Sequence, residues 1–149
     1  IVQDQLSGVP EFFTLDYLHV STGSQSVPTA TVQLCKDDEI FQDAACGDGP
    51  VDAVLKTIDR ISGHPGKVLD FSLQAITKGK DAVGEVSIQV EFGKQVLAGK
   101  GSSTDIVEAG AKAYLNTLNR YLFVQRQAKT NAPGRGQQKN TTARKGKIA

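Results

Sequence analysis

The sequence contains no methionine and no tryptophan, and only 6% of its 149 residues are aromatic. No apolar stretch approaches the ~20 residues that span a bilayer, and the N-terminus lacks the basic-then-apolar pattern of a secretory signal. We therefore predict a cytoplasmic chain with no membrane partner. Because the chain starts at Ile1 and has no methionine anywhere, we interpret it as a fragment of a longer polypeptide.

Cysteine and histidine are too few and too scattered to form a metal site or a disulfide framework. Cys35 and Cys46 fall in predicted strands without further ligands nearby, and His19 and His64 are far apart. Nothing indicates a secretory context that would favour oxidation. We therefore predict two buried free thiols and no metal site.

Sequence motifs of catalysis are also missing. There is no nucleophile elbow, Walker loop, dinucleotide fingerprint or zinc-hydrolase motif. Asp37, Asp38 and Asp43 have no basic partner at a useful spacing, so we interpret them as solvated surface groups. We expect no catalytic residue and no cofactor in this chain.

The formal net charge of +1 conceals an uneven distribution. Residues 125–149 hold seven of the 17 basic residues and no acidic residue, so residues 1–124 keep ten basic against 16 acidic residues. The C-terminal segment also has almost no large apolar side chain, which predicts a folded domain at 1–124 and a disordered basic tail at 125–149. Because the tail has no interleaved aromatic residues and the body is acidic, we favour a solvated tail over a nucleic-acid-binding one.

An internal repeat organises the first 124 residues. Residues 15–17 recur as 69–71 and Gly47 recurs as Gly101, both at an offset of 54. Further along, the offset becomes 60, so the second helix is expected to begin about six residues, or one and a half turns, earlier relative to its glycine. The residues related by this second offset are Ala53, Leu55, Thr57 and Arg60, which correspond to Ala113, Leu115, Thr117 and Arg120.

Each repeat is expected to contain three strands followed by a helix. The first helix should begin at Pro50 and end at Gly63, and the second should run from near Asp105, capped together with Glu108, to about Val124. The predicted class is therefore α+β, with duplicated β-β-β-α units related by a pseudo-twofold axis, antiparallel sheets and helices packed on one face. Alternating apolar residues predict strands at 13–21, 29–35, 40–46, 68–76, 84–92 and 95–101, with a hairpin turn at residues 93–94.

Exposed sheet or helix surface in such a fold invites a second copy of the chain, so we expect a homodimer with an isologous interface. Small residues at 109–111 of the second helix would permit close approach of another backbone. Such packing would compensate for the ~1 kcal/mol that Gly110 costs in a helix interior, although a tolerated imperfection is the alternative.

One local pattern indicates a binding site. Residues 45–51 read Ala-Cys-Gly-Asp-Gly-Pro-Val and form a glycine-rich turn from a strand into a helix. Glycines let a ligand approach the backbone, and the N-terminus of a helix favours a small anion such as a carboxylate. The alternative is an ordinary tight turn that binds nothing.

Several segments in the same order resemble a known family. The segments are residues 13–34, 47–53, 79–85, 104–109 and 113–120. Together, over roughly residues 10–122, they closely resemble the allosteric and dimerisation domain of 2-isopropylmalate synthases.

The resemblance implies a regulatory role. Full-length members of that family are acyltransferases that condense acetyl-CoA with 2-oxoisovalerate on a metal-bearing (β/α)8 barrel, and leucine binds the C-terminal domain and inhibits them. By this resemblance the partners are leucine, a second copy of the chain and a catalytic barrel in the same polypeptide, with the divalent metal in that barrel. Two alternatives stay open: the isoleucine-sensing domain of a citramalate synthase, and a dimerisation module that binds no amino acid.

The resemblance also implies which residues bind the effector. The glycine turn would receive the amino-acid head group, and apolar side chains would surround the rest. The family often has tyrosine where this sequence has Phe71, and a plain hydrophobic core is the alternative interpretation of the apolar members. The candidate effector-binding residues are Gly47, Asp48, Gly49, Pro50, Val51, Ala53, Val68, Phe71, Ala82, Gly84 and Ile106.

Overall fold

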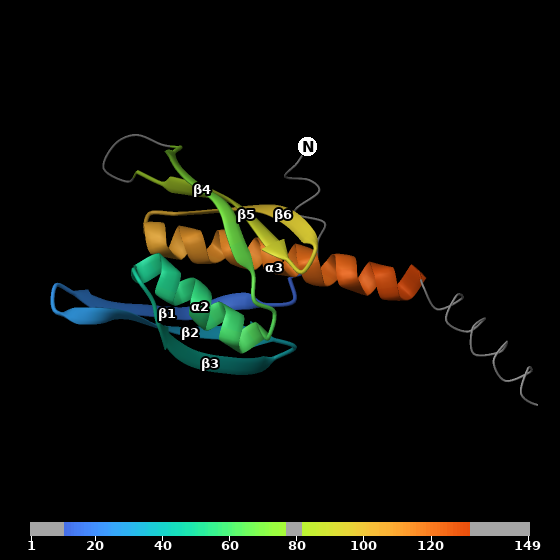
Figure 1. The fold of residues 1–149 in the computed structure, drawn as a ribbon, viewed down its shortest axis with the longest axis horizontal. Coiled ribbons are helices and arrows are strands. Elements are labelled where there is room, and N and C mark those ends of the chain that lie inside the picture. The colour runs from blue at the N-terminus through green and yellow to red at the C-terminus, as the bar shows by residue number, and fades with distance from the viewer. Residues whose placement is uncertain (1–10, 77–81, 132–149) are drawn as a thin grey trace, which may run out of the picture.

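A computed structural model of the chain describes residues 11–76 and 82–131. The described residues fold as two successive β-β-β-α units (Figure 1), which confirms the predicted α+β duplication. The first unit contains β1 (Thr14–Gly23), β2 (Ser26–Lys36), β3 (Glu39–Cys46) and α2 (Pro50–Ser62); the second contains β4 (Lys67–Ala75), β5 (Gly84–Phe92), β6 (Gln95–Ser103) and α3 (Ile106–Asn131).

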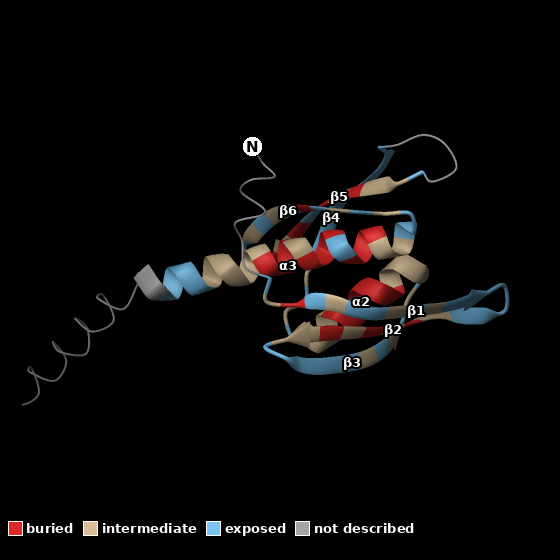
Figure 2. Ribbon diagram, turned by 180° about the vertical axis from the view of Figure 1, so that it is seen from behind, coloured by how far each residue is buried: buried red, intermediate tan, exposed pale blue. Residues whose placement is uncertain are grey.

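The strands form two separate antiparallel sheets in the orders β1-β2-β3 and β4-β5-β6. The helices lie between the sheets (Figures 1 and 2), with α2 against β2 and β3 and α3 against β5 and β6. Each central strand therefore turns one apolar face towards a helix. The fully buried residues of that face in β2 are Ala30, Val32 and Leu34, and β5 contributes Val86, Ile88, Val90 and Phe92.

The two glycines of the repeat make the same close approach to their helices. A Cβ atom added to Gly47 would lie 2.4 Å from the amide nitrogen of Ala53, and one added to Gly101 would lie 2.5 Å from that of Ala113. Both predicted offsets, 54 and 60, are therefore present in the fold. On the offset of 60, Pro50 corresponds to Gly110, yet α3 begins at Ile106. The second helix is thus four residues, or about one turn, longer at its start than the first, rather than the predicted one and a half turns. The difference arises because α3 begins five residues after Gly101, whereas α2 begins three residues after Gly47.

The limits of α2 follow local sequence signals. Pro50 occupies the first turn, where its missing N–H costs nothing, and Gly63 ends the helix with a left-handed φ of 77°. At α3 the predicted capping box forms only in part. Asp105 Oδ1 accepts a hydrogen bond from the Val107 amide at 2.9 Å, but Glu108 accepts one from the Ser103 hydroxyl at 2.7 Å.

The end of α3 differs from the prediction. The helix continues past Val124 to Asn131, because residues 125–131 include good helix formers and no glycine or proline. Arg126 lies over the ring of Phe12, 5.8 Å from its centroid, so the start of the predicted tail is helical and contacts the residues before β1. The rest of that tail lies outside the described residues. Neither helix is long and apolar enough to cross a membrane over the described residues.

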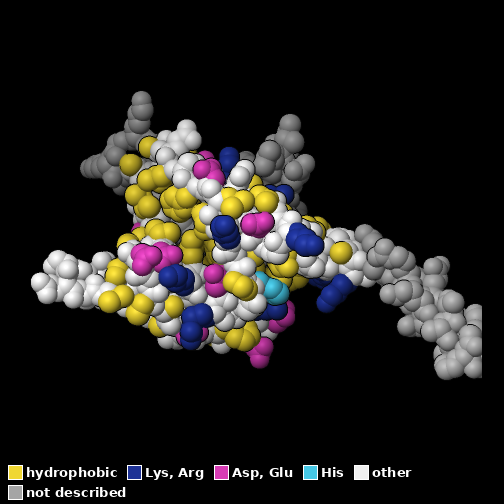
Figure 3. All heavy atoms as spheres, in the orientation of Figure 1, with side chains coloured by type: hydrophobic (Ala, Val, Ile, Leu, Met, Phe, Trp, Pro, Cys, Tyr) yellow, Lys and Arg dark blue, Asp and Glu magenta, His cyan; other side chains and the backbone are white. Residues whose placement is uncertain are grey.

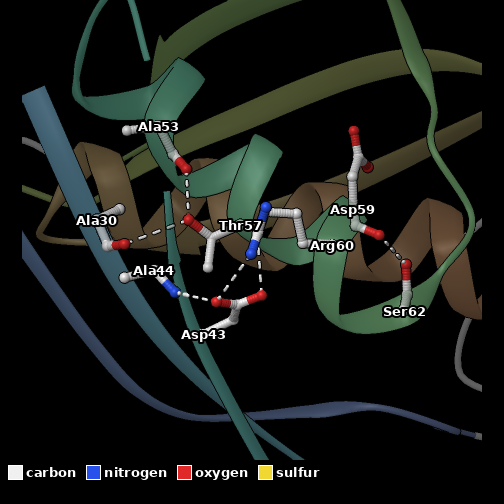
Figure 4. Close-up of polar contacts among 8 residues, drawn as sticks. All are labelled: Ala30, Asp43, Ala44, Ala53, Thr57, Asp59, Arg60 and Ser62. Carbon is white, nitrogen blue, oxygen red and sulfur yellow. Dashed lines mark hydrogen bonds and ion pairs between the residues drawn. The ribbon is translucent and has the colours of Figure 1, made fainter. Parts of the chain in front are cut away.

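Polar contacts attach α2 to the first sheet (Figure 4). The Thr57 hydroxyl donates to the carbonyl oxygens of Ala53 at 2.7 Å and Ala30 at 3.3 Å, and Arg60 Nε donates to Asp43 Oδ2 at 2.9 Å. The interpretation of Asp43 as an unpaired surface group was therefore wrong, because the fold brings Arg60 to it from 17 residues away. Hydrogen bonds from Arg60 and from the Ala44 amide hold the pKa of Asp43 below its usual range.

Both cysteines are free thiols, as predicted, but they are not buried. Cys46 is exposed and Cys35 is half-buried. Their pairing partners, Thr29 and Ile40, lie on the face of the first sheet that points away from α2. Burial was therefore the wrong expectation for these two side chains.

Candidate functional site

The glycine turn connects β3 to α2 and is fixed by short-range contacts. The Gly47 amide donates to the carbonyl oxygen of Pro28 at 3.0 Å, and the Asp48 amide donates to Asp52 Oδ2 at 2.9 Å. Gly47 also packs directly on buried Ala53, so a larger residue has no room there. Glycine at position 47 is therefore explained by packing alone.

Glycine at position 49 has no such explanation. Its φ of −158° is extended backbone that any residue adopts, and a Cβ atom added there would meet nothing within 4 Å. No side chain caps α2 at this residue, and the first amides of a helix lack partners within the helix. The turn therefore opens the positive end of α2 to its surroundings, as the binding of a small anion requires.

Acidic groups lie beside this helix end. Asp52 accepts the hydrogen bond from the Asp48 amide and pairs with Lys56 at 3.1 Å, and these contacts keep the pKa of Asp52 below its ordinary value. The Asp48 side chain is exposed. The turn thus offers hydrogen-bond donors at the helix end and negative charge beside it, which is complementary to a zwitterion.

Two of the predicted apolar residues converge on α3. A Cβ atom added to Gly110 would lie 3.7 Å from Val51 Cγ1 and 3.7 Å from Phe71 Cε2. The nearest atoms to Gly110 outside its own helix thus belong to side chains. The expected close approach of another backbone along residues 109–111 occurs at Ala109, whose carbonyl oxygen would lie 2.5 Å from a Cβ atom added to Gly101, whereas the neighbours of Gly110 are the side chains of Val51 and Phe71.

Ile106 belongs to the same region. It is the first residue of α3 and lies one helical turn before Gly110, and 47% of its surface is exposed. Phe71 is 38% exposed although its ring reaches α3. Figure 3 shows hydrophobic side chains gathered around the hollow between β4 and α2. The structure therefore joins the glycine turn, Val51, Phe71 and Ile106 at one open, mostly apolar region.

The other three candidates are spread along the second sheet. Val68 pairs with Val90, and Gly84 pairs with Ala75 at the far end of β4. Gly84 and Val90 are six positions apart in β5, or about 20 Å of extended strand. One leucine molecule cannot touch both ends within one chain. Ala82 precedes Gly84 and is exposed.

Strand β4 carries an open apolar face. Val68, Phe71 and Leu73 lie on the same side of the sheet as the buried side chains of β5. Helix α3 packs on β5 and β6 and leaves these three side chains of β4 partly uncovered. These three side chains are therefore 37–49% exposed, although they continue the apolar surface of the core. The pairs that define this face are Val68 with Val90, Phe71 with Ile88, and Leu73 with Val86.

A second hollow lies away from these residues. This groove of about 470 Å³ borders Gly101, the repeat counterpart of Gly47. Its amide side chains already have partners, since Asn119 binds the backbone of Phe13 and Asn116 donates to the carbonyl of Lys100. Within residues 11–76 and 82–131, no three His, Cys, Asp or Glu side chains cluster to hold a metal ion.

Sequence reasoning missed a polar contact between the two repeats. The hydroxyl of Tyr114 in α3 donates to Asp59 Oδ1 in α2. Burial raises the pKa of Asp59 from 3.8 to about 6, and burial together with Asp59 also raises the pKa of Tyr114. The two residues are 55 positions apart, so no local pattern could have paired them.

Comparison with known proteins identifies the family of this chain. The sequence profile of the LeuA allosteric (dimerisation) domain matches residues 1–122. A protein of Carboxydothermus hydrogenoformans named 2-isopropylmalate synthase is 49% identical over 124 residues, which cover 83% of this chain and 24% of that protein. Proteins of the same name from Pelotomaculum thermopropionicum and Nostoc sp. are 46% and 45% identical over 83% and 87% of the chain.

The chain spans about a quarter of the length of these curated relatives. The family match, by contrast, extends over both β-β-β-α units, from before β1 into α3. The chain therefore belongs to the family of LeuA allosteric (dimerisation) domains.

Proposed function

We propose that this chain is the leucine-sensing regulatory domain of a 2-isopropylmalate synthase. In this proposal leucine binds between the glycine turn and the open apolar region, and its binding inhibits an acyltransferase site on a catalytic barrel of the same polypeptide. The metal and the catalytic residues belong to that barrel. The observation that carries the proposal is the uncapped N-terminus of α2 beside the partly exposed side chains of Val51, Phe71 and Ile106.

The polar end of the region suits an amino-acid head group. A carboxylate would accept hydrogen bonds from the first amides of α2 and gain from the helix dipole. The ammonium group would lie towards the exposed carboxylate of Asp48. Gly49 leaves room for these contacts, because no atom lies within 4 Å of the position that its Cβ would take.

The apolar end suits a branched aliphatic side chain. Val51 and Phe71 meet at Gly110, and Ile106 lies one helical turn before it, so the three side chains are available to cover four carbon atoms of a ligand. Each methylene removed from water would contribute about 0.8 kcal/mol. Leucine and isoleucine bury the same number of carbons, so preference between them depends on shape and amounts to about 1–3 kcal/mol at most.

The same open face supports a homodimer. Val68, Phe71 and Leu73 extend the core surface of the second sheet into solvent, and Leu69 and Ile76 are about half exposed nearby. A second copy would remove this apolar surface from water, and the family to which the chain belongs is described as a dimerisation domain. The pocket and the dimer contact would then share strand β4.

Calorimetric titration of the 149-residue chain with leucine and with isoleucine tests the proposal. We expect saturable heat with leucine, weaker binding of isoleucine, and a dimer by sedimentation. Preference for isoleucine would favour the regulatory domain of a citramalate synthase instead. A dimer that binds neither amino acid would refute amino-acid sensing and leave an assembly module.

Restoring the chain to its full-length enzyme tests the regulatory half of the proposal. Gly49→Asp would cap α2 with its own carboxylate and occupy the amides that leucine needs. The variant should therefore fold and remain active but ignore leucine, because a ligand that no longer binds cannot shift an equilibrium. Wild-type inhibition by leucine in this variant would exclude the glycine turn as the sensor.

A further inference from the structure

Gly110 lies where the two repeats differ. On the offset of 60 that relates the two helices, Gly110 corresponds to Pro50, the first residue of α2. The preceding turn of α3, from Ile106 onwards, has no counterpart in the first unit. The additional turn ends at Gly110, which faces Val51 at the start of α2, and it places Ile106 one turn away on the same face of α3. The asymmetry of the duplication therefore adds a turn of helix beside the open apolar region.

The contacts of Gly110 within the chain do not require glycine. The residue is buried, its backbone is helical, and glycine is among the poorest helix formers. An added Cβ atom would lie 3.7–3.8 Å from its nearest neighbours, which is ordinary van der Waals contact. Gly47, Gly99 and Gly101 are different, because a Cβ atom there would come within 2.8 Å of backbone atoms. Alanine would therefore fit at position 110 and improve the helix.

The neighbours of Gly110 indicate what the missing methyl group leaves room for. They are Val51, which directly follows Pro50 at the glycine turn, and the partly exposed ring of Phe71. Gly110 thus lies on the α3 side of the apolar region that begins at the glycine turn. A ligand side chain that enters between Val51 and Phe71 would come closest to α3 at this residue.

We propose that Gly110 sets the size of the ligand side chain that this site accepts, and that its missing methyl group makes room for the terminal methyl groups of leucine. This inference rests on the proposed leucine site. Alanine at position 110 would shorten the space by one methyl group without disturbing the fold. The loss would be larger for leucine than for valine, whose side chain is one carbon shorter.

Calorimetry of the Gly110→Ala variant with leucine and valine tests the inference. The variant should melt about 2–8 °C higher than the wild type because its helix is improved. Its affinity for leucine should fall about 10- to 200-fold, the usual effect of one methylene in an apolar pocket, while its affinity for valine falls less. Gln127→Ala, which alters an exposed position of the same helix, should leave both affinities unchanged.

The outcomes separate this inference from the proposed function. If the wild-type chain binds leucine and Gly110→Ala binds it equally well, Gly110 does not set the size of the site. A variant that sediments as a monomer would also overturn the inference, because Gly110 would then be needed by a partner copy. If the wild-type chain binds no leucine, the proposed function itself fails.

Discussion

The contact between Asp59 and Tyr114 predicts an unusual dependence of stability on pH. Burial raises the pKa of Asp59 from 3.8 to about 6, although the hydrogen bond from Tyr114 partly opposes this shift. Between these pH values the unfolded chain has lost the proton that the folded chain still holds. Stability from this group is therefore complete below about pH 4 and declines until about pH 6.

The magnitude follows from the two pKa values. A change from 3.8 to about 6 corresponds to about 3 kcal/mol, and because Asp59 is only partly buried we expect screening to leave about half of it, ~1.5 kcal/mol. Asp59→Asn cannot ionise and has an oxygen that can accept from Tyr114. The variant should thus gain about 1.5 kcal/mol relative to the wild type between pH 4 and pH 7.

Urea unfolding followed by circular dichroism at half-unit pH steps measures this difference. Subtracting the wild-type curve from the variant curve removes the contributions of the other carboxylates, including Asp43 and Asp52, whose pKa values are lowered and which act in the opposite direction. Tyr114→Phe removes the opposing hydrogen bond, so its decline should extend above pH 6. A difference between Asp59→Asn and wild type that stays constant from pH 4 to pH 7 would refute the reasoning.

Three further predictions follow from packing. Gly47→Ala should lower the free energy of unfolding by about 1–3 kcal/mol, because the added Cβ atom clashes with the Ala53 amide. Gly49→Ala should be tolerated, and equal melting temperatures of the two variants would contradict this prediction. Leu73→Lys, at a side chain that is 49% exposed on β4, should yield a folded monomer by sedimentation, and a persistent dimer would exclude this face. Deleting residues 132–149 should leave the melting temperature unchanged. Deleting residues 125–149 should lower it, because this deletion also removes Arg126 from the ring of Phe12. Identical melting temperatures of the two truncated chains would count against a stabilising role of that contact.

The elements that the sequence predicted best are those with strong local signals. Pro50 and Gly63 mark the ends of α2, and Gly93, with a φ of 61°, marks the turn between β5 and β6. The end of α3 was missed because residues 125–131 are mostly polar yet compatible with a helix, so polarity was mistaken for disorder. A polar composition indicates that a segment is exposed to solvent, but it does not indicate that a helix ends there. A helix usually ends at a specific residue such as glycine.

The candidate site divides in the same way. The glycine turn was predictable because its residues are contiguous and its chemistry is that of a helix end. The meeting of Val51 with Phe71 at Gly110 depends on three elements and on the extra turn of α3, so no spacing in the sequence reveals it. The pairing of Asp43 with Arg60 was likewise missed because it depends on the packing of α2 over β3.

Backbone amide spectra of the 149-residue chain during a leucine titration test the central claim most directly. Leucine at the glycine turn should shift the resonances of Gly47, Asp48, Gly49 and Val51 together with those of Phe71, Ile106 and Gly110, at a single saturating affinity. Shifts confined to Gly101, Ser102 and Asn116 would assign the ligand to the second groove, and a spectrum unchanged by leucine would contradict the account altogether.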